Sequence, residues 1–545
     1  MSALIASIVS RSCFSKRFLL FNNLKVSQTY SSTAHLTTKK SSECLKAVVG
    51  LELHAQINAS SKLFSSSPAK YGAAPNTQVS NFDAAMPGTL PVLNRYCVEA
   101  AVKTALAFGC KINKKSSFDR KHYFYADMPS GYQITQYRHP LAIGGELDYV
   151  IYVRGRHKKA RICKARLQQI QLEQDSGKSL HDSEGRQSLV DLNRAGVALM
   201  EIVTEPDFED GEQAAAFVRD IQASLKLINT CDGKMEQGSL RIDANISVHK
   251  PGSPYGVRTE VKNLNSVKSV EQAIDYEVKR QKNLLARGGQ VINQTMSFDC
   301  DTRQTVAMRD KERLQDYRFM AEPNLPPIVL TDGSTDNPHI LSIDHIRAGM
   351  PELLPALRQR LISYGLSLEQ AMTTIELRLV NIFEEMLKLS SNPTVSSQSA
   401  FRFLNLVVVR ACSEQKCSLE HLLSVVTLEK LSHLWHAYEK EALTHISSTE
   451  LLHRLLNEPA ATVQALLESG EFTRISDERE ILRYCVAVAE NNPKLARRYQ
   501  KKKGSREFAE LISIIQKDSE NRIDHVDLFR VLRAYLDSKP SSSNS

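Results

Sequence analysis

The sequence lacks the short motifs that identify many nucleotide-binding and hydrolytic enzymes. It contains no GxxxxGK(S/T) phosphate-binding loop and no GxGxxG fingerprint, and no Ser-His-Asp order can be identified. Its ten cysteines form no CxxC pair and no zinc-type spacing, which favours reduced thiols in an intracellular compartment. No apolar run approaches the length of a membrane span, so we expect no membrane insertion. Any active site must therefore combine residues that are dispersed along the chain.

The first 40 residues lack Asp and Glu but contain six Lys or Arg residues and many Ser and Thr. Apolar residues beside Arg11 permit a basic amphipathic helix, and this composition is typical of a mitochondrial transit peptide. Arg11, Lys16 and Arg17 interrupt the apolar stretches, which argues against the alternative of a secretory signal. We therefore predict a transit peptide over residues 1–44 and a location in the mitochondrial matrix.

The remaining chain is only weakly basic. Removing the six cationic residues of the first 40 lowers the formal net charge from +9 to +3. A length of 545 residues, with 42% hydrophobic and 24% charged residues, indicates a soluble globular protein of more than one domain. Nucleic-acid binding therefore has to be argued from a local patch rather than from the total charge.

Residues 235–265 alternate with a period of two. Leu, Ile, Ala or Val occupies every even position from 240 to 248, whereas Ser, Arg, Asp or Asn occupies every odd position from 239 to 247. The sequence PGSPYG at 251–256 predicts a turn, and Arg258, Glu260 and Lys262 share one face of a second strand. We predict a hairpin with an apolar back and a polar front, and that front is either a functional face or an ordinary solvated one.

Acidic residues and one histidine recur on other predicted strands. Glu52 and His54 alternate onto one face of residues 45–57, where they could bind one cation together or form a solvated pair. Glu201 shares its strand face with apolar residues, which is costly unless the carboxylate is paired. The candidate acids and the histidine are Glu52, His54, Glu173, Glu201, Glu236 and Asp243, and the accompanying cations are Lys121, Arg194, Arg241 and Lys262.

These groups, if they converge, suit a Mg²⁺ ion held by a few carboxylates together with substrate phosphates. The cations could neutralise charge on a transferring phosphoryl group. The residues thus permit phosphoryl transfer at a site built on a sheet, and they do not identify the acceptor.

Residues 118–137 (FDRKHYFYADMPSGYQITQY) interleave aromatic rings with charged side chains. Tyr123, Tyr125 and Tyr137 follow Arg120 and Lys121 closely in the sequence. Such a segment suits the stacking of a base with cations on its phosphate, or else an aromatic cluster that closes a sheet edge.

Strand alternation ends near residue 342, and amphipathic helical segments follow to about residue 537. Residues 390–399 are predicted to be a linker. A basic cluster near the end of the chain is either a solvated face or a contact for RNA phosphates. It contains Lys494, Arg497, Arg498, Lys501, Lys502 and Lys503.

In several short motifs, some of them in the segments described above, the chain resembles the B subunit of glutamyl-tRNA(Gln) amidotransferase, the GatB family. The match runs in order from about residue 48 to residue 327, and MPEL at 350–353 and ISD at 475–477 extend it into the helical half. The first motifs are GLELH (50–54), FDRKHYFY (118–125), GYQI (131–134), DLNRAG (191–196) and EIVTEPD (201–207).

The resemblance implies an α+β fold. A cradle-shaped catalytic domain with a mixed or antiparallel sheet is expected over residues 45–335. An all-helical linker domain at 336–398 and a small helical, tRNA-binding tail domain at 399–540 follow it, and a disordered end is expected at 541–545.

The resemblance also implies an enzyme, a glutamine-hydrolysing carbon–nitrogen ligase. In this family, ATP with Mg²⁺ phosphorylates the side-chain carboxylate of misacylated Glu-tRNA(Gln), and ammonia then displaces phosphate to give Gln-tRNA(Gln). A glutaminase A subunit supplies the ammonia, and a small C subunit completes the heterotrimer.

Carried over by position, the resemblance implies metal binding by Glu52, His54 and Glu173. It implies that Lys121, Glu201, Glu236 and Asp243 belong to catalytic motifs. It also implies that the basic tail cluster contacts the tRNA. It also implies phosphate or tRNA-end contacts for Lys121, Tyr123, Arg194, Arg241 and Lys262.

The chain departs from the family pattern in one loop. Bacterial relatives often bind zinc in this loop through two cysteine pairs. This chain has three hydroxyls and one carboxylate at those positions, and such groups would not hold structural Zn²⁺. We therefore expect no structural zinc and a loop held by packing. The substituted positions are Ser65, Ser67, Ser80 and Asp83.

Two further departures remove charge near the proposed site. Gln174 and Gln237 stand where the family usually has Glu. The main alternative is therefore a tRNA-binding scaffold that has lost phosphoryl transfer. An unrelated metal-dependent hydrolase is a more remote alternative.

Overall fold

The structure is a computed structural model that describes residues 45–182, 184–308, 317–389, 393–502 and 505–538. The described chain from Leu45 onward forms one compact unit. The predicted transit peptide and the predicted disordered end lie outside the described residues. The α+β fold class is confirmed, because a large sheet is followed by helices alone.

Within the described residues, ten strands form one sheet in the order β15-β14-β13-β12-β1-β11-β8-β6-β2, with β7 paired to β8. The pairs along this order are antiparallel except for β13 with β14. The strands are β1 (Lys46–Gln56), β2 (Lys111–Ile112), β6 (Ala142–Ile143), β7 (Glu146–Ile151), β8 (Arg161–Gln174), β11 (Ala198–Thr204), β12 (Leu240–His249), β13 (Thr259–Leu264), β14 (Thr295–Asp299) and β15 (Gln304–Ala307).

Three smaller sheets accompany it. One pairs β9 (Lys178–Asp182) with β10 (Gln187–Asp191), a hairpin that was not predicted. The others join β16 (Met320–Ala321), β4 (Asp119–His122) and β5 (Tyr132–Thr135), and β18 (Leu341–Ser342), β17 (Ile328–Thr331) and β3 (Lys115–Ser116).

The alternation of apolar and polar residues gives the large sheet one apolar face. On β1, Val49, Leu51 and Leu53 are fully buried, whereas Glu52 and His54 alternate with them and stay partly exposed. The even positions of β12 are buried in the same way, and β12 pairs antiparallel with β13, which confirms the predicted hairpin. The polar face is therefore free for a site.

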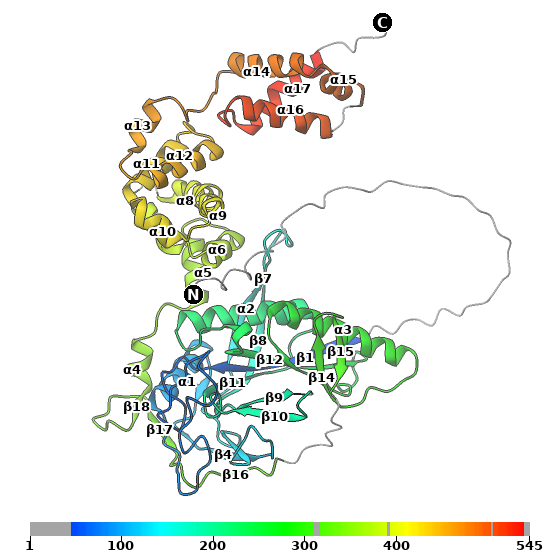
Figure 1. The fold of residues 1–545 in the computed structure, drawn as a ribbon, viewed down its shortest axis with the longest axis vertical. Helices are drawn as coiled ribbons and strands as arrows, with labels where there is room; N and C mark the ends of the chain where they lie inside the picture. Colours follow the sequence, from blue (N-terminus) through cyan, green and yellow to red (C-terminus); the bar gives the residue numbers. More distant parts are fainter. Residues whose placement is uncertain (1–44, 183, 309–316, 390–392, 503–504, 539–545) are drawn as a thin grey trace, which may run out of the picture. The chain divides into compact units, whose positions relative to one another are not determined.

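Helices α1 (Arg95–Ala107), α2 (Gly211–Leu227) and α3 (Val267–Ala286) share the core of the apolar face. Asn94, Asp210 and Ser266 begin them, because each side chain accepts a hydrogen bond from a backbone N–H of the first turn. Figure 1 shows α2 and α3 side by side on one side of the sheet and β4, β9 and β10 on the other.

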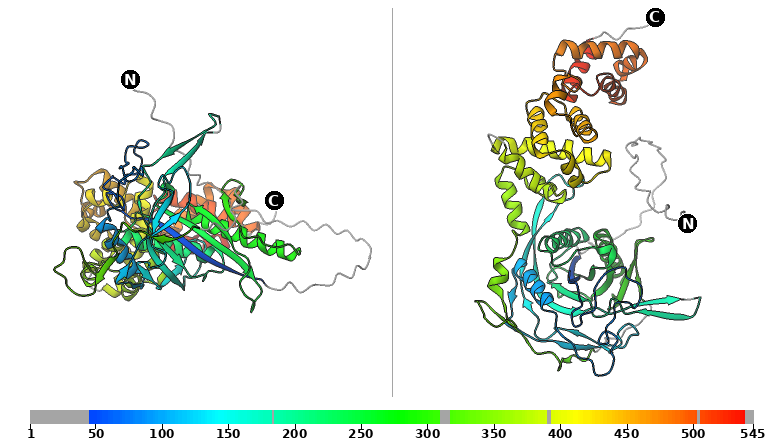
Figure 2. Two further views of the ribbon diagram at one scale, coloured as in Figure 1. Left: turned by 90° about the horizontal axis from the view of Figure 1, so that it is seen from below. Right: turned by 60° about the vertical axis from the view of Figure 1, so that its left-hand side comes forward.

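The chain after β18 is helical, as the yellow-to-red part of Figure 2 shows. None of the described helices has both the length and the apolar character that crossing a membrane requires. These helices are α4 (Ile343–Ala348), α5 (Leu354–Ser363), α6 (Leu368–Glu376), α7 (Val380–Lys388), α8 (Pro393–Phe403), α9 (Val409–Gln415), α10 (Leu419–Val425), α11 (Leu428–Glu439), α12 (His445–Asn457), α13 (Val463–Glu468), α14 (Glu478–Asn491), α15 (Pro493–Lys502), α16 (Ser505–Asp518) and α17 (His525–Ser538).

The hydrophobic cores divide these helices differently from the predicted domain boundary at 398–399. One core joins residues from Leu361 to Phe472, and a second joins residues from Ile475 to Leu536. Most of the predicted linker at 390–399 is instead the start of α8, because Ala400 and Phe403 anchor that helix in the first core. We therefore propose that the tail domain begins between Phe472 and Ile475.

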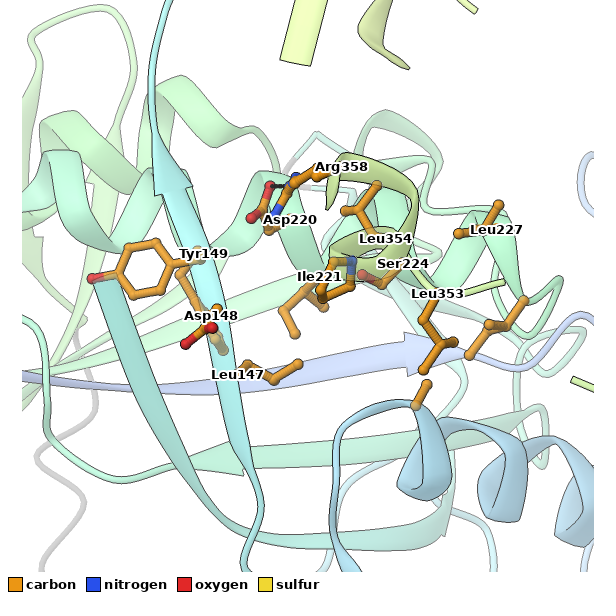
Figure 3. Close-up of a pocket in the computed structure, with 14 residues that line it drawn as sticks. Leu147, Asp148, Tyr149, Asp220, Ile221, Ser224, Leu227, Leu353, Leu354 and Arg358 are labelled. Carbon is orange, nitrogen blue, oxygen red and sulfur yellow. Dashed lines mark hydrogen bonds and ion pairs between the residues drawn. The ribbon is translucent and has the colours of Figure 1, made fainter. Parts of the chain in front are cut away.

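A buried ion pair ties α5 to the catalytic domain (Figure 3). Arg358 Nη2 donates to Asp220 Oδ1 of α2 at 2.6 Å, and Asp220 Oδ2 accepts from the backbone N–H of Val150 on β7 at 3.0 Å. Arg358 is 5% exposed, so removing it leaves the Asp220 charge buried and less well partnered.

We predict that Arg358→Met destabilises the junction of α5, α2 and β7 by about 3–5 kcal/mol. Hydrogen exchange measured by mass spectrometry should show faster exchange in peptides that cover Val150 and α5. The matched control is Arg360→Met, because Arg360 lies on the same helix but pairs with Glu352 and Glu384 at a partly exposed position. That control should cost about 1 kcal/mol or less. Equal exchange in the two variants would contradict the assigned role of Asp220 and Arg358.

Candidate active site

The register of β1 places the predicted acids opposite one another on the polar face. His54 pairs with Glu201 of β11 on one side and with Arg241 of β12 on the other. Glu52 pairs with Asp243 of β12. Directly opposed residues on neighbouring strands point to the same face, so residues separated by up to about 190 positions in sequence meet in one cluster.

Glu52, His54 and Glu201 form a candidate metal-binding group. One potential ligand atom from each lies within 4.8 Å of the other two, and His54 Nε2 is 3.7 Å from Glu52 Oε1. Two carboxylates and one imidazole suit a divalent cation that keeps several water ligands, such as Mg²⁺ or Mn²⁺. The predicted trio contained Glu173, and the structure groups Glu201 with Glu52 and His54 instead.

Glu173 lies beside this group on β8. Its Oε1 atom accepts a hydrogen bond from Gln133 Nε2 at 2.7 Å, whereas its buried Oε2 atom has no hydrogen-bond partner within the described residues. A buried carboxylate oxygen without a donor is costly, so this atom is available to a cation or a substrate donor. The donor set therefore fits a metal, with Glu173 as a neighbouring acceptor.

The carboxylates of Glu52 and Glu201 have pKa values that are shifted in opposite directions. Burial, the charge of Glu173 and the contact with Glu52 hold the pKa of Glu201 well above its usual range. Burial opposes ionisation of Glu52 as well, but hydrogen bonds from Glu201 and His54 outweigh it and lower the pKa of Glu52. Glu201 is therefore the weaker acid of the two.

His54 lies among the acids of the same cluster. Burial lowers its pKa, but the hydrogen bond to Glu52 and the charges of Asp243, Glu52 and Glu173 outweigh burial and raise it. A divalent cation bound there would likewise offset the negative charge of these acids.

Lys121 of β4 adds a permanent positive charge. Burial lowers its pKa, yet the charges of Glu173 and Glu201 outweigh burial and raise it. Its ammonium lies 5.0 Å from the centre of the Tyr317 ring. The predicted role of Lys121 as an electrostatic contact therefore agrees with its position.

Other predicted cations are held near the cluster by acids. Asp175 accepts from Arg241 at 3.0 Å and lies 3.4 Å from Arg194, whose guanidinium also donates to the carbonyl oxygens of Ser176 and Gly177. Lys262 Nζ is 3.6 Å from Glu260. Arg241 and Lys262 thus lie on the same sheet face as the acids, whereas Arg194 is largely occupied by the chain itself.

One predicted catalytic residue lies elsewhere. Glu236 is exposed on a short 3-10 turn (Met235–Gln237) and makes no contact with the acidic cluster within the described residues. The strand alternation that places Asp243 in the site begins only at Leu240, so it does not extend to residue 236. A catalytic role for Glu236 therefore stays a prediction, whereas Asp243 faces Glu52 and accepts from the Asn263 N–H at 2.8 Å.

Sequence reasoning missed two amides that orient the acids. Gln171 Nε2 donates to Glu201 Oε2 at 2.5 Å, and Gln133 donates to Glu173 and to the carbonyl oxygen of Gln174. Tyr123, a predicted cofactor contact, donates its hydroxyl to Gln133 at 3.4 Å. The alternation of Gln171 with Glu173 was the available signal, because both share one face of β8.

The loop that lacks the cysteines is held by a polar network as well as by packing. Lys62 is fully buried and donates to Asp83 at 3.0 Å, and Asp83 also accepts from Ser65 Oγ and from the backbone N–H of Ser80. Lys62 donates in addition to the carbonyl oxygen of Leu192 at 3.3 Å. The expectation of packing alone was therefore incomplete, because an ion pair occupies the centre of the loop.

Neither substituted glutamine lies in the acidic cluster. Gln174 lies on the same face of β8 as the core residues Ile170 and Leu172, whereas Glu173 lies on the opposite face. Gln237 lies on the 3-10 turn with Glu236. The loss of these two charges therefore leaves the group of Glu52, His54 and Glu201 intact.

The basic tail cluster lies on α15. Lys494, Arg497 and Arg498 are exposed there, and the helix continues through Lys501 and Lys502. Lys503 lies outside the described residues. The three exposed side chains are accessible to a polyanion.

We predict that Glu201→Gln and His54→Ala each weaken Mn²⁺ binding at least about tenfold, since each removes one ligand of the proposed group. Electron paramagnetic resonance of free Mn²⁺ would measure this on the full chain. Glu236→Gln removes a carboxylate outside the group and should bind Mn²⁺ as the unmodified protein does. Loss of affinity in Glu236→Gln, with full affinity in the other two variants, would contradict the assigned group.

The geometry can be compared with known proteins. Residues 47–336 match the family model described as the GatB/GatE catalytic domain, and residues 381–536 match the GatB domain. The B subunit of the mitochondrial glutamyl-tRNA(Gln) amidotransferase of Homo sapiens is 43% identical over 508 residues, which cover 92% of this chain and 90% of the relative. The protein of the same name in Aedes aegypti is 44% identical, with 89% and 92% covered.

A bacterial relative agrees over a shorter region. The B subunit of the aspartyl/glutamyl-tRNA(Asn/Gln) amidotransferase of Orientia tsutsugamushi (strain Ikeda) is 46% identical over 352 residues, which cover 64% of this chain and 69% of the relative. The two matched domains, the ordered motifs and this similarity lead to one conclusion. The chain belongs to the GatB family, the B subunits of tRNA-dependent amidotransferases.

Proposed function

We infer that this chain is the amidating subunit of a mitochondrial glutamyl-tRNA(Gln) amidotransferase. Relatives with that name align with it over about nine-tenths of their length. The reaction proposed is the ATP-dependent conversion of Glu-tRNA(Gln) to Gln-tRNA(Gln). The single observation that carries the inference is the convergence of Glu52, His54, Glu201 and Lys121 on the polar face of the sheet.

The chemistry requires activation of a carboxylate. A glutamyl carboxylate is a poor acyl donor, so one of its oxygens first attacks the γ-phosphorus of ATP and ADP leaves. Ammonia then attacks the carbonyl carbon of the acyl phosphate, phosphate leaves, and a proton is lost to give the amide. Positioning and charge neutralisation supply most of the catalysis of such transfers.

The residues of the chain fit these demands. The Lys121 ammonium is held beside two acids at the polar face, where it can orient an anionic carboxylate or phosphate. Arg241 and Lys262 lie on the same face and can contact further phosphate oxygens. Glu173, whose Oε2 lacks a donor, can accept a proton from the attacking ammonia.

Mg²⁺ fits the group of Glu52, His54 and Glu201, and when bound it would neutralise charge on the transferring phosphoryl group. Gln171 fixes the orientation of Glu201 from the neighbouring strand. These contacts hold the ligands in place before substrate arrives.

The partners follow from the same proposal. A glutaminase A subunit supplies ammonia, and a small C subunit completes a heterotrimer. The tail domain contacts the body of the tRNA, and the exposed cations of α15 support that role. The scaffold alternative was based on a loss of charge near the proposed site. Gln174 and Gln237 lie outside the acidic cluster, so they do not support that alternative.

The decisive assay uses the chain co-expressed with candidate A and C partners, together with Glu-tRNA(Gln), ATP, Mg²⁺ and ammonium chloride. Ammonium bypasses the glutaminase, so the assay isolates the chemistry of this chain. We expect ATP-dependent conversion to Gln-tRNA(Gln), and we expect Glu173→Gln and His54→Ala to abolish both conversion and tRNA-dependent ATP cleavage. Tight tRNA binding without ADP formation in the unmodified complex would instead support the scaffold.

A second prediction concerns the tail. Replacing Lys494, Arg497 and Arg498 by Ala should weaken tRNA binding. A plot of the logarithm of the tRNA association constant against the logarithm of the salt concentration should become less steep, by about 0.7–0.9 for each phosphate that the protein no longer neutralises. The maximal rate at saturating tRNA should stay unchanged, because these residues lie on the exposed side of α15, whose buried residues belong to a core separate from that of the catalytic domain. An unchanged salt slope would exclude α15 as a phosphate-binding element.

A further inference from the structure

A row of five aromatic rings passes beside the Lys121 ammonium, which lies 5.0 Å from the centre of the middle ring, Tyr317. Ring centres are separated by 5.5 Å for Tyr125 and Tyr123, 6.4 Å for Tyr123 and Tyr317, and 6.1 Å for Tyr317 and Phe319. Tyr137 and Phe319 end the row as a parallel stack, with centres 4.0 Å apart and planes inclined by 8°. We call these five residues the aromatic row.

Rigid elements hold the stacked end of this row. Buried Asp119 accepts from the backbone N–H of Tyr137 at 3.1 Å and also pairs with the side chain of Arg138. On the other side, β16 follows Phe319 directly and pairs with β4, and Arg120 makes two hydrogen bonds to Glu322. The stacked pair is therefore preorganised, so a ligand would spend little conformational entropy in binding it.

The row is exposed at both ends. Tyr137 is 54% exposed although its ring already stacks on Phe319, and Tyr125, at the other end, is 47% exposed. A core cluster of aromatic residues would bury such rings, as the same protein does with Phe64 and Phe118. An exposed, ordered, parallel stack can instead accept a further planar ring.

We propose that the aromatic row is a nucleobase-stacking site that takes the unpaired 3′ end of the tRNA acceptor strand. This inference rests on the proposed function, because it requires the free side-chain carboxylate of the tRNA-bound glutamyl residue to reach Lys121. The α-carboxyl of that residue is esterified to the terminal ribose, so the last bases must lie between the acidic cluster and solvent. Tyr317, Phe319 and Tyr137 follow this course, from the ring beside Lys121 to the exposed ring at one end of the row.

Single-stranded RNA ends suit such a surface. Their bases have free faces that stack on aromatic side chains without regard to sequence, and each stacked base contributes a measurable part of the affinity. The adenine of ATP has the same stacking chemistry, so an experiment must separate the two ligands.

The test uses the double variant Tyr137→Leu/Phe319→Leu of the full chain and two forms of the tRNA. One form is complete, and the other lacks the unpaired nucleotides at its 3′ end. We expect the double variant to bind complete tRNA about 5- to 100-fold more weakly and to bind the shortened form as the unmodified chain does. Affinity for ATP should be unchanged, and the conservative variant Tyr137→Phe should retain binding.

The matched control is Tyr255→Leu, because Tyr255 is an exposed tyrosine, 64% accessible, whose ring contacts His249 outside the aromatic row. It should bind both RNAs normally. Equal losses for complete and shortened tRNA, or a loss of ATP affinity alone, would overturn the proposal. The binding of tRNA is measured without turnover, so it does not depend on catalysis. A complex that fails to amidate Glu-tRNA(Gln) would contradict the proposed function, whereas the binding measurements alone decide whether the aromatic row holds the 3′ end.

Discussion

The antiparallel pairing of β1 with both β11 and β12 is the constraint on which the candidate site depends. It sets Glu52 opposite Asp243 and His54 opposite Glu201. A register shift by one residue would turn the acids towards the core and the buried leucines towards solvent. The large apolar face therefore fixes the register, and through the register it fixes the site.

The concentration of acids has an electrostatic consequence. Glu277 is fully buried elsewhere in the same domain, and it accepts hydrogen bonds from Thr259, Thr305 and Arg280, so its charge is satisfied. The acidic cluster is different, because burial and neighbouring acids raise the pKa of Glu201, and because Glu173 has an oxygen without a donor within the described residues. A satisfied acid stabilises a fold, whereas an unsatisfied group of acids indicates a place for a cation or a substrate.

The loop at residues 60–94 connects to this site without metal-type ligands. Lys62 bridges Asp83 of the loop and the Leu192 carbonyl oxygen, and the Leu63 N–H donates to the Gly196 carbonyl oxygen. The turn between them contains Arg194, which lies beside Asp175 and hence near Arg241. Burial lowers the pKa of Lys62, and Asp83 offsets part of that effect. The ion pair thus fastens the loop to the edge of the site.

The sequence by itself determined the local structure and the chemistry available. Period-two alternation placed Glu52 with His54 and Arg241 with Asp243, and ordered motifs indicated the family. Only the tertiary structure decided which groups meet. It grouped Glu201 with Glu52 and His54, kept Glu173 near them, left Glu236 on an exposed turn, and joined residues from Leu361 to Phe472 in one core. The reason is that alternation specifies a face, whereas register and shared cores depend on contacts between residues far apart in the chain.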